Sequence, residues 1–200
     1  MSIMAKSIDA AMGERERPLM EATLRIIGRA GLDSVTHRAV ATEAGMSVGA
    51  VTHHFRTRDG LVEAALRFAL SRELAKLRAF ALRLQDKAFD TDAWIDALVA
   101  HYAGELRSDP ETHIACYEAF LAAARAARYR AVVAEWFAVW QQSAELALRA
   151  AGSKNAALDA DVFVSTLLGL LLKQLASPRR GFAAESRTAL KRLVACLAAP

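Results

Sequence analysis

The segment "THHFRTR", residues 52–58, holds two adjacent histidines and two arginines, which could bind either a metal ion or an anionic partner. A metal site is disfavoured, because neighbouring residues on a helix point about 100° apart. No cysteine, aspartate or further histidine lies at the spacing of a metal ligand. Imidazole and guanidinium groups can instead contact phosphate oxygens. We therefore predict no metal here and consider a polyanionic partner.

Catalysis is the main competing chemistry. His101, Glu105, His113 and Glu118 carry groups that could serve as acids or bases. No metal spacing, phosphate-binding loop or nucleophile motif accompanies them, and such residues are common on helices. We assign no catalytic residue and no cofactor, and we predict that the chain is not an enzyme.

The residues around the histidines predict two short helices joined by a tight turn. Thr36 can cap a helix over 37–44, Gly45 can end it in a left-handed conformation, and Ser47 can cap a second helix, 48 to about 54. This is the layout of a helix-turn-helix motif. The second helix presents a face of small side chains that could enter a major groove roughly 12 Å wide. These residues are Val48, Gly49, Thr52 and His53.

The remaining sequence predicts an all-α protein. The 200 residues are 54% hydrophobic and include only four prolines and ten glycines, and helical periodicity continues from about residue 59 to 197 without a strand pattern. The net charge of +4 permits a polyanionic partner without requiring one. We predict about nine helices in three parts: a disordered extension over 1–14, a three-helix DNA-binding domain over 15–60, and a helical bundle for ligand binding and dimerisation over 61–200.

The sequence "LDSVTHRAVATEAGMSVGAVTHHFRTRDGLVEAAL" resembles the TetR family of bacterial transcriptional repressors, and the resemblance covers roughly residues 18–66. It implies an N-terminal DNA-binding domain and a C-terminal domain that dimerises and holds an inducer. The implied DNA contacts, completed by the basic Arg56, are Thr36, Arg38, Ser47, Val48, Gly49, Thr52, His53, His54, Arg56 and Arg58. Thr52 departs from the family, which often has tyrosine there, so the nearby histidines and arginines would carry more of the backbone contact.

The two C-terminal helices predict self-association. The helix over 159–176 is apolar on nearly every side, which is more apolar surface than one small domain can cover. A two-fold dimer would bury it in a four-helix bundle and place two recognition helices about 34–36 Å apart on a palindromic operator. The alternative is an intramolecular core. The predicted interface residues are Phe163, Leu167, Leu168, Leu171, Leu190, Leu193, Val194 and Leu197.

Aromatic residues in the middle helices predict a ligand pocket. Clustered rings with a few polar tips suit a small organic molecule, although a packed core would also explain them. A ligand there would tilt the long helix over 59–84 and move the DNA-binding domains out of register. The predicted pocket residues are Trp94, His101, Tyr102, Cys116, Tyr117, Phe120, Trp136, Phe137 and Trp140.

Together these features predict a ligand-responsive transcriptional regulator, a repressor that binds double-stranded DNA as a homodimer and is released by a small, mostly apolar inducer. The longest apolar run is shorter than the roughly 20 residues of a membrane span. The N-terminal segment has no signal-peptide pattern. Cys116 and Cys196 suit buried positions in a reducing compartment, so we expect a cytoplasmic protein without membrane contact. The competing hypothesis is a helical protein-interaction or small-molecule-binding module that has lost DNA binding.

Overall fold

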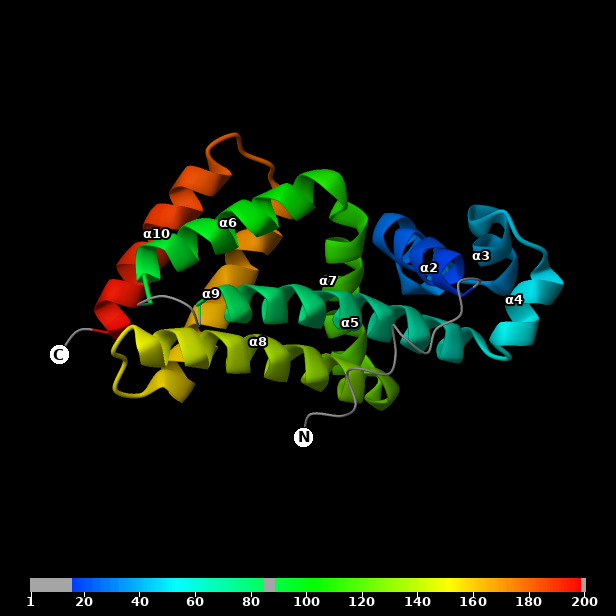
Figure 1. Ribbon diagram of the computed structural model, residues 1–200. Helices are drawn as coiled ribbons and strands as arrows, with labels where there is room; N and C mark the ends of the chain where they lie inside the picture. The colour runs from blue at the N-terminus through cyan, green and yellow to red at the C-terminus, as the bar shows by residue number, and fades with distance from the viewer. Residues whose placement is uncertain (1–15, 85–88, 199–200) are drawn as a thin grey trace. The chain divides into compact units, whose positions relative to one another are not determined.

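The computed structural model describes residues 16–84 and 89–198, with the backbone alone for 78–84. Within these ranges the chain forms nine α-helices and no strand, which confirms the all-α prediction (Figure 1). The predicted disordered extension over 1–14 lies outside the described residues. The helices are α2 (Arg17–Ala30), α3 (His37–Ala44), α4 (Val48–His54), α5 (Arg58–Leu84), α6 (Thr91–Ser108), α7 (Pro110–Arg125), α8 (Arg130–Ala150), α9 (Ala156–Ala176) and α10 (Phe182–Leu197), with 3-10 turns η2 (Leu32–Ser34) and η3 (Ala127–Tyr129).

The chain divides into two compact units. Unit 1 comprises residues 1–76 and 110–136, and unit 2 comprises residues 77–109 and 137–200. The divisions at 76/77 and 136/137 fall inside α5 and α8, so each of these helices continues from one unit into the other. The unit that contains the helix-turn-helix segment therefore also contains α7, which follows it in the sequence by about fifty residues.

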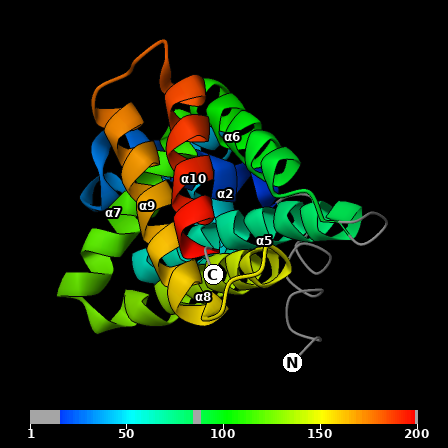
Figure 2. The same cartoon turned by 90° about the vertical axis from the view of Figure 1, so that its left-hand side faces the viewer.

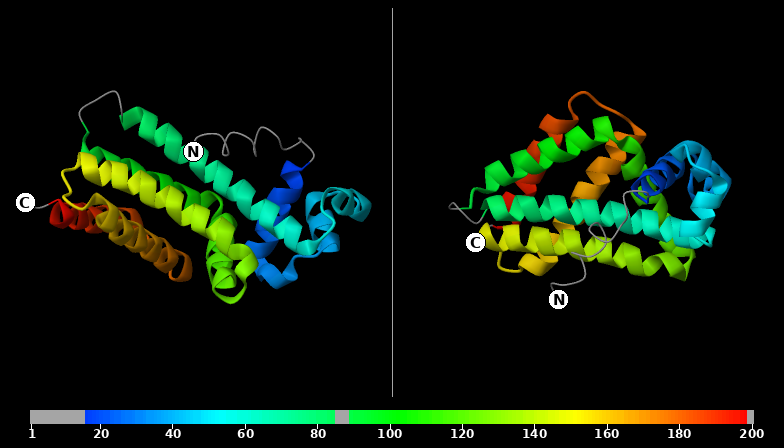
Figure 3. Two further views of the ribbon diagram at one scale, coloured as in Figure 1. Left: turned by 90° about the horizontal axis from the view of Figure 1, so that it is seen from below. Right: turned by 45° about the vertical axis from the view of Figure 1, so that its right-hand side comes forward.

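Unit 1 is built around α2. This helix packs against α3 on one side and α7 on the other, and α3 in turn packs against α4 (Figure 1). The corner between α7 and α8, formed by η3, lies beside the end of α2 (Figure 3, left). Apolar side chains from α2, the α2–α3 loop, α3, α4 and α5 fill the interior, because each of these elements buries one apolar face against the others. The buried side chains include Leu19, Met20, Leu24, Ile27, Val35, Val40, Val51, Leu61, Leu66 and Phe68.

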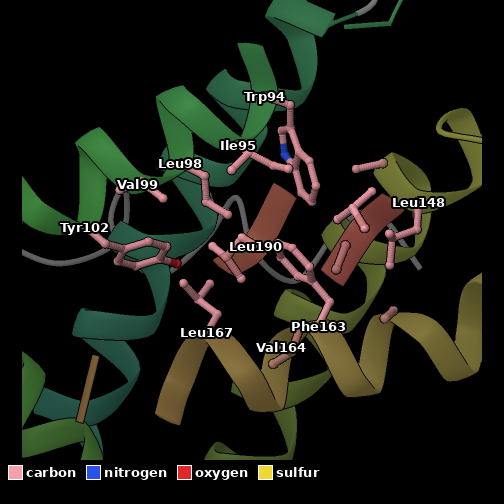
Figure 4. Packing of buried hydrophobic residues seen from close by; sticks show 14 of the residues in the cluster. Trp94, Ile95, Leu98, Val99, Tyr102, Leu148, Phe163, Val164, Leu167 and Leu190 are labelled. Carbon is pink, nitrogen blue, oxygen red and sulfur yellow. The ribbon is translucent and has the colours of Figure 1, made fainter. Parts of the chain in front are cut away.

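Unit 2 has its own apolar core, with α10 packed between α6 and α9 (Figure 2). Side chains of α6 face those of α9 and α10 across this core (Figure 4). The rings of Trp94 and Phe163 stack with centroids 4.9 Å apart. Ion pairs flank the core, with Lys191 Nζ 3.2 Å from Asp92 and 3.1 Å from Asp96. The C-terminal helix is thereby fastened to α6.

The α9 helix is not buried on every side within unit 2. Phe163, Leu167 and Leu171 are buried, while the opposite face leaves large apolar side chains in solvent. The exposed fractions are 59% for Leu158, 41% for Val162 and 47% for Leu172. The sequence predicts that this helix has more apolar surface than one domain can cover. In the structure this is true of one face of α9 only.

Candidate nucleic-acid interface and ligand pocket

The turn between α3 and α4 has the geometry that the sequence predicts. Gly45 has φ 66° and ψ 31°, the left-handed region that a side chain disfavours. Its N–H donates to the carbonyl of Thr42 at 3.3 Å, and the N–H of Met46 donates to that of Ala41 at 2.9 Å. These two bonds form the Schellman pattern, which satisfies the last carbonyls of α3. The chain can therefore end one helix and begin the next within three residues.

Hydroxyl caps fix where each helix of the motif starts. The Thr36 hydroxyl accepts from the N–H of Ala39 at 3.0 Å, and the Ser47 hydroxyl accepts from the N–H of Ala50 at 3.1 Å. Both predicted caps are confirmed. The N–H groups at the start of a helix lack intrahelical partners, so each cap satisfies a donor that would otherwise need water.

The outer face of α4 is bare. Val51 is fully buried beneath the helix, whereas the side chains on its outer side are exposed, with Val48 at 45%. The Thr52 hydroxyl donates to the Val48 carbonyl at 2.9 Å, which leaves its oxygen free to accept. No described residue covers this face, whose exposed residues are Val48, Gly49, Thr52 and His53.

Polar contacts hold α3 in place against its neighbours. His37 Nε2 donates to the Phe55 carbonyl at 2.7 Å, joining the start of α3 to the end of α4. Arg25 Nε donates to Glu43 at 2.7 Å and joins α2 to α3, and this bond holds the pKa of Glu43 below its ordinary value. The role of His37 could not be predicted from the sequence, because its partner is a backbone carbonyl 18 residues away.

The predicted DNA contacts fall into two groups. Eight of the ten have exposed side chains or an exposed backbone, and these are Thr36, Arg38, Ser47, Val48, Gly49, Thr52, His53 and Arg56. The other two are half-buried. His54 Nδ1 lies 3.3 Å from Glu16, just before α2. Arg58 Nε donates to the Val35 carbonyl at 2.9 Å, and its Nη2 donates to the Leu32 carbonyl. These contacts orient both side chains within unit 1.

Arg58 fastens the start of α5 to the loop before α3. Its guanidinium also lies 3.3 Å from both Asp33 and Asp59, so four donor contacts are made inside the unit. We expect Arg58→Ala to lower the free energy of unfolding by about 2 kcal/mol, since two carbonyls lose a charged donor. Arg58→Lys should restore only part of this, because an ammonium group cannot reproduce the planar fork. Urea unfolding would test this, and an unchanged midpoint for Arg58→Ala would contradict the fastening role.

Unit 2 contains an apolar pocket between α6, α8 and α9. Its volume is about 30 Å³, so it is nearly filled by side chains. Its lining includes the indoles of Trp94 and Trp140, with Tyr102 and Ser143 as the polar members. The complete lining is Leu77, Trp94, Leu98, Tyr102, Trp140, Ser143, Ala144, Phe163, Val164, Leu167, Leu168 and Leu171.

The structure brings together only part of the predicted pocket. Of the nine residues, Trp94, Tyr102 and Trp140 line the cavity of unit 2. His101 and Phe137 belong to unit 2 but do not line this cavity. The others belong to unit 1, namely Cys116, Tyr117, Phe120 and Trp136. They are close in the sequence, but α7 packs on α2 and its residues belong to unit 1.

The predicted interface residues also lie differently from the expectation. Phe163, Leu167, Leu168 and Leu171 line the pocket. Leu190 and Val194 are buried in the core of unit 2, while Leu193 and Leu197 pack against it. A second copy could therefore contact little of this set, whereas three large apolar side chains are exposed on the other face of α9, namely Leu158, Val162 and Leu172. Periodicity could not separate the two faces, because both are apolar.

The fold and the site together define a helix-turn-helix protein with a second helical unit. Residues 19–65 match the family model of bacterial regulatory proteins, tetR family, and residues 90–196 match the tetracyclin repressor-like C-terminal domain. The second match alone covers more than half of the chain. The chain belongs to the tetR family of bacterial regulatory proteins, which confirms the resemblance and its assignment to regulators rather than enzymes.

Individual relatives agree with this assignment. The multidrug binding protein EbrR, solved with ethidium, is 31% identical, with 90% of this chain and 98% of EbrR covered and a TM-score of 0.65. A TetR family member from Streptomyces coelicolor A3 is 30% identical over 90% of this chain and 98% of its own, with a TM-score of 0.70. The HTH-type transcriptional regulator BetI of Burkholderia thailandensis is 46% identical over 56 residues, 28% of this chain and 29% of BetI.

The matches to curated regulators are partial. The chain spans between 29% and 50% of the length of the BetI proteins from Burkholderia thailandensis and Cronobacter sakazakii. In the described part of the chain, no helix has the length and hydrophobicity needed to cross a membrane.

Proposed function

We propose that this chain is a ligand-responsive transcriptional regulator that binds a palindromic DNA operator as a homodimer, represses transcription, and is released by a small, mostly apolar ligand. The observation that carries the proposal is the bare outer face of α4 at a capped, glycine-ended turn. A narrow helix surface with small side chains fits the major groove, where base edges are read. Acting on bacterial DNA, the protein would work in the cytoplasm.

The proposed DNA contacts divide by position. Val48, Gly49, Thr52 and His53 would face base edges, with the Val48 and Thr52 methyl groups suited to a thymine methyl. Arg38 and Arg56 are exposed and make no ion pair with any described residue, so both would be free to hold phosphates. His54 and Arg58, already bound within unit 1, would act mainly by orienting α4 and α5.

Arg38→Ala should weaken operator binding by about 1–3 kcal/mol and lower the slope of log affinity against log salt by about one. The loss follows from removing one phosphate contact and the counterions that it releases. Because Arg38 makes no hydrogen bond or ion pair with a described residue, the thermal midpoint should not change. The measurement is a gel-shift titration at several salt concentrations on a bound fragment from a genomic library.

Arg107→Ala is the matched control, since Arg107 is also exposed and unpaired among the described residues but lies on α6 in unit 2. It should bind DNA like the unsubstituted chain. If Arg38→Ala and Arg107→Ala bound DNA with equal affinity, Arg38 would not be part of the DNA interface. Failure to bind any double-stranded DNA in a salt-dependent way would favour the module that has lost DNA binding.

The proposed dimer uses the exposed face of α9. This face consists of five exposed residues, Leu158, Val162, Ser165, Gly169 and Leu172. The last four lie four, seven, eleven and fourteen residues after Leu158, so all five share one side of the helix. Three large apolar side chains exposed on one side of a helix favour an interaction site there. The small residues let a second helix approach closely, so a symmetric α9 contact with α10 at its flank is the proposed interface.

The proposed ligand site is the pocket of unit 2. Its lining contains no charged residue among the described side chains, which favours a ligand of low polarity. EbrR is complexed with ethidium and with proflavin. The two indoles of the pocket described here could stack on a flat aromatic molecule. The pocket is nearly filled, so ligand entry would have to displace side chains. Leu77 of α5 lines it, and this helix continues into unit 1.

A further inference from the structure

Unit 1 contains a second cavity that differs in character from the proposed ligand pocket. Its volume is about 270 Å³, and polar and charged side chains make up much of its lining. The walls come from the end of α2 with η2, the start of α5, one face of α7, and η3. The lining residues are Ala30, Gly31, Leu32, Asp33, Arg58, Glu118, Ala122, Arg125, Ala126, Arg128 and Tyr129.

Small residues keep this cavity open. Gly31 has φ 80°, a conformation that favours glycine, and a Cβ at this position would point toward Glu118, whose Oε2 would lie 3.9 Å away. On the facing side, Ala122 and Ala126 carry only methyl groups. These small residues therefore leave space between the longer side chains of the lining.

Most charged groups of the lining are already paired. Arg58 donates to carbonyls and lies near Asp33 and Asp59. Arg128 Nη1 lies 3.4 Å from Asp59, and its guanidinium stacks on the Tyr129 ring with 5.1 Å to the centroid. Glu118 and Arg125 are the exceptions, since neither makes an ion pair or hydrogen bond with any residue that the structure describes.

The two unpaired groups lie on the same helix. Glu118 and Arg125 are seven residues apart on α7, so their backbone positions are about 10 Å apart along the axis and on the same face. Both line one cavity, one with a carboxylate and the other with a guanidinium. A single anion would satisfy only Arg125, and a single cation only Glu118. A molecule with both charges at its two ends would satisfy both.

We propose that this cavity binds a small linear molecule with an ammonium group at one end and a carboxylate at the other. The ammonium group would donate to Glu118, and the carboxylate would accept from Arg125 in the fork geometry that a guanidinium favours. The site would be separate from the apolar pocket of unit 2 and independent of the proposed inducer. It borders the Gly31–Leu32–Asp33 segment that Arg58 holds before α3.

A series of ω-amino acids that differ in the distance between the ammonium group and the carboxylate would test the proposal. Calorimetric titrations of the full chain with glycine, γ-aminobutyrate and ε-aminocaproate should show affinity rising with the distance between the charges. The longest should bind with a dissociation constant below about 1 mM. Caproate and hexylamine each lack one charge and should bind at least about tenfold more weakly than ε-aminocaproate, because caproate forms no ion pair with the half-buried Glu118 and hexylamine forms none with the exposed Arg125.

Glu118→Gln and Arg125→Gln should each weaken ε-aminocaproate binding at least about tenfold, and Arg107→Gln should leave it unchanged. All three chains should fold, because none of these side chains pairs with a described residue, and thermal melting would verify this. The proposal is overturned if no ω-amino acid binds, if binding is insensitive to both cavity substitutions, or if caproate binds as tightly as ε-aminocaproate.

Discussion

A chain carrying Val162→Glu together with Leu172→Glu is expected to sediment as a monomer and to lose at least about a hundredfold of its affinity for the operator. Both side chains are exposed in unit 2, at 41% and 47%, and lie on the same face of α9. A two-fold contact across this face would bring four carboxylates together. Burying unpaired charges costs several kcal/mol per ion, more than the apolar contact gains.

The effect on DNA binding follows because a dimer has two recognition helices that are joined to each other. In a dimer, binding of one recognition helix to a half-site raises the effective concentration of the other near its own half-site. A monomer binds each half-site separately and loses that gain. Sedimentation at micromolar concentration and gel shifts on the same operator would measure the two effects.

Leu121→Glu is the matched control for this experiment. Leu121 is also strongly exposed, at 54%, but lies on α7 in unit 1, outside the proposed interface. This variant should keep the association state and the DNA affinity of the unsubstituted chain. If the double variant remained a dimer, with its melting temperature unchanged, the exposed face of α9 would not be the interface.

Gly28→Ala is expected to lower the free energy of unfolding by about 3 kcal/mol. The backbone of α7 comes so close to α2 here that a Cβ on Gly28 would lie 2.3 Å from the carbonyl oxygen of Glu111 and 2.6 Å from its Cα. These are backbone atoms and cannot rotate away. Accommodating the methyl group requires α7 to shift, which would disturb the packing of Ala115 and Ala119, both almost fully buried. Urea unfolding followed by circular dichroism would measure the change.

Gly104→Ala, also inside a helix, is expected to raise the free energy of unfolding and not to lower it. Gly104 lies inside α6, and a Cβ there would meet no atom within 4 Å. Because alanine has the higher helix propensity, this variant should gain up to about 1 kcal/mol. If Gly28→Ala behaved like Gly104→Ala, the close approach of α2 and α7 would not constrain this position. The pair therefore separates steric contact from propensity.

The helix-turn-helix could be predicted almost residue by residue because its signals are local. The helices over 37–44 and 48–54, the caps at Thr36 and Ser47, and the left-handed Gly45 all occur as predicted. Each depends on bonds that span three to five residues. The helices predicted over 59–84 and 159–176 also occur close to those bounds, as α5 and α9, since a helical period needs no information about distant neighbours.

The pocket could not be predicted in the same way. Trp94, Tyr102 and Trp140 were identified because aromatic residues are conspicuous in the sequence. Phe163 and Leu167, which face them, were instead assigned to the dimer interface. Both faces of α9 are apolar, and only the packing against α6 and α10 determines which one is enclosed. The roles of His37 and Arg58 were missed for a related reason, because their partners are backbone carbonyls 18 to 26 residues away.

The sequence by itself determined the helices, their ends, the DNA-binding motif and the family. Those properties come from hydrogen bonds and side-chain preferences within one or two helical turns. Only the tertiary structure decided that α7 joins the first unit, which face of α9 stays exposed, and where Glu118 and Arg125 meet a common cavity. These depend on close approach between segments far apart in the chain, as at Gly28, where a missing Cβ lets two backbones nearly touch.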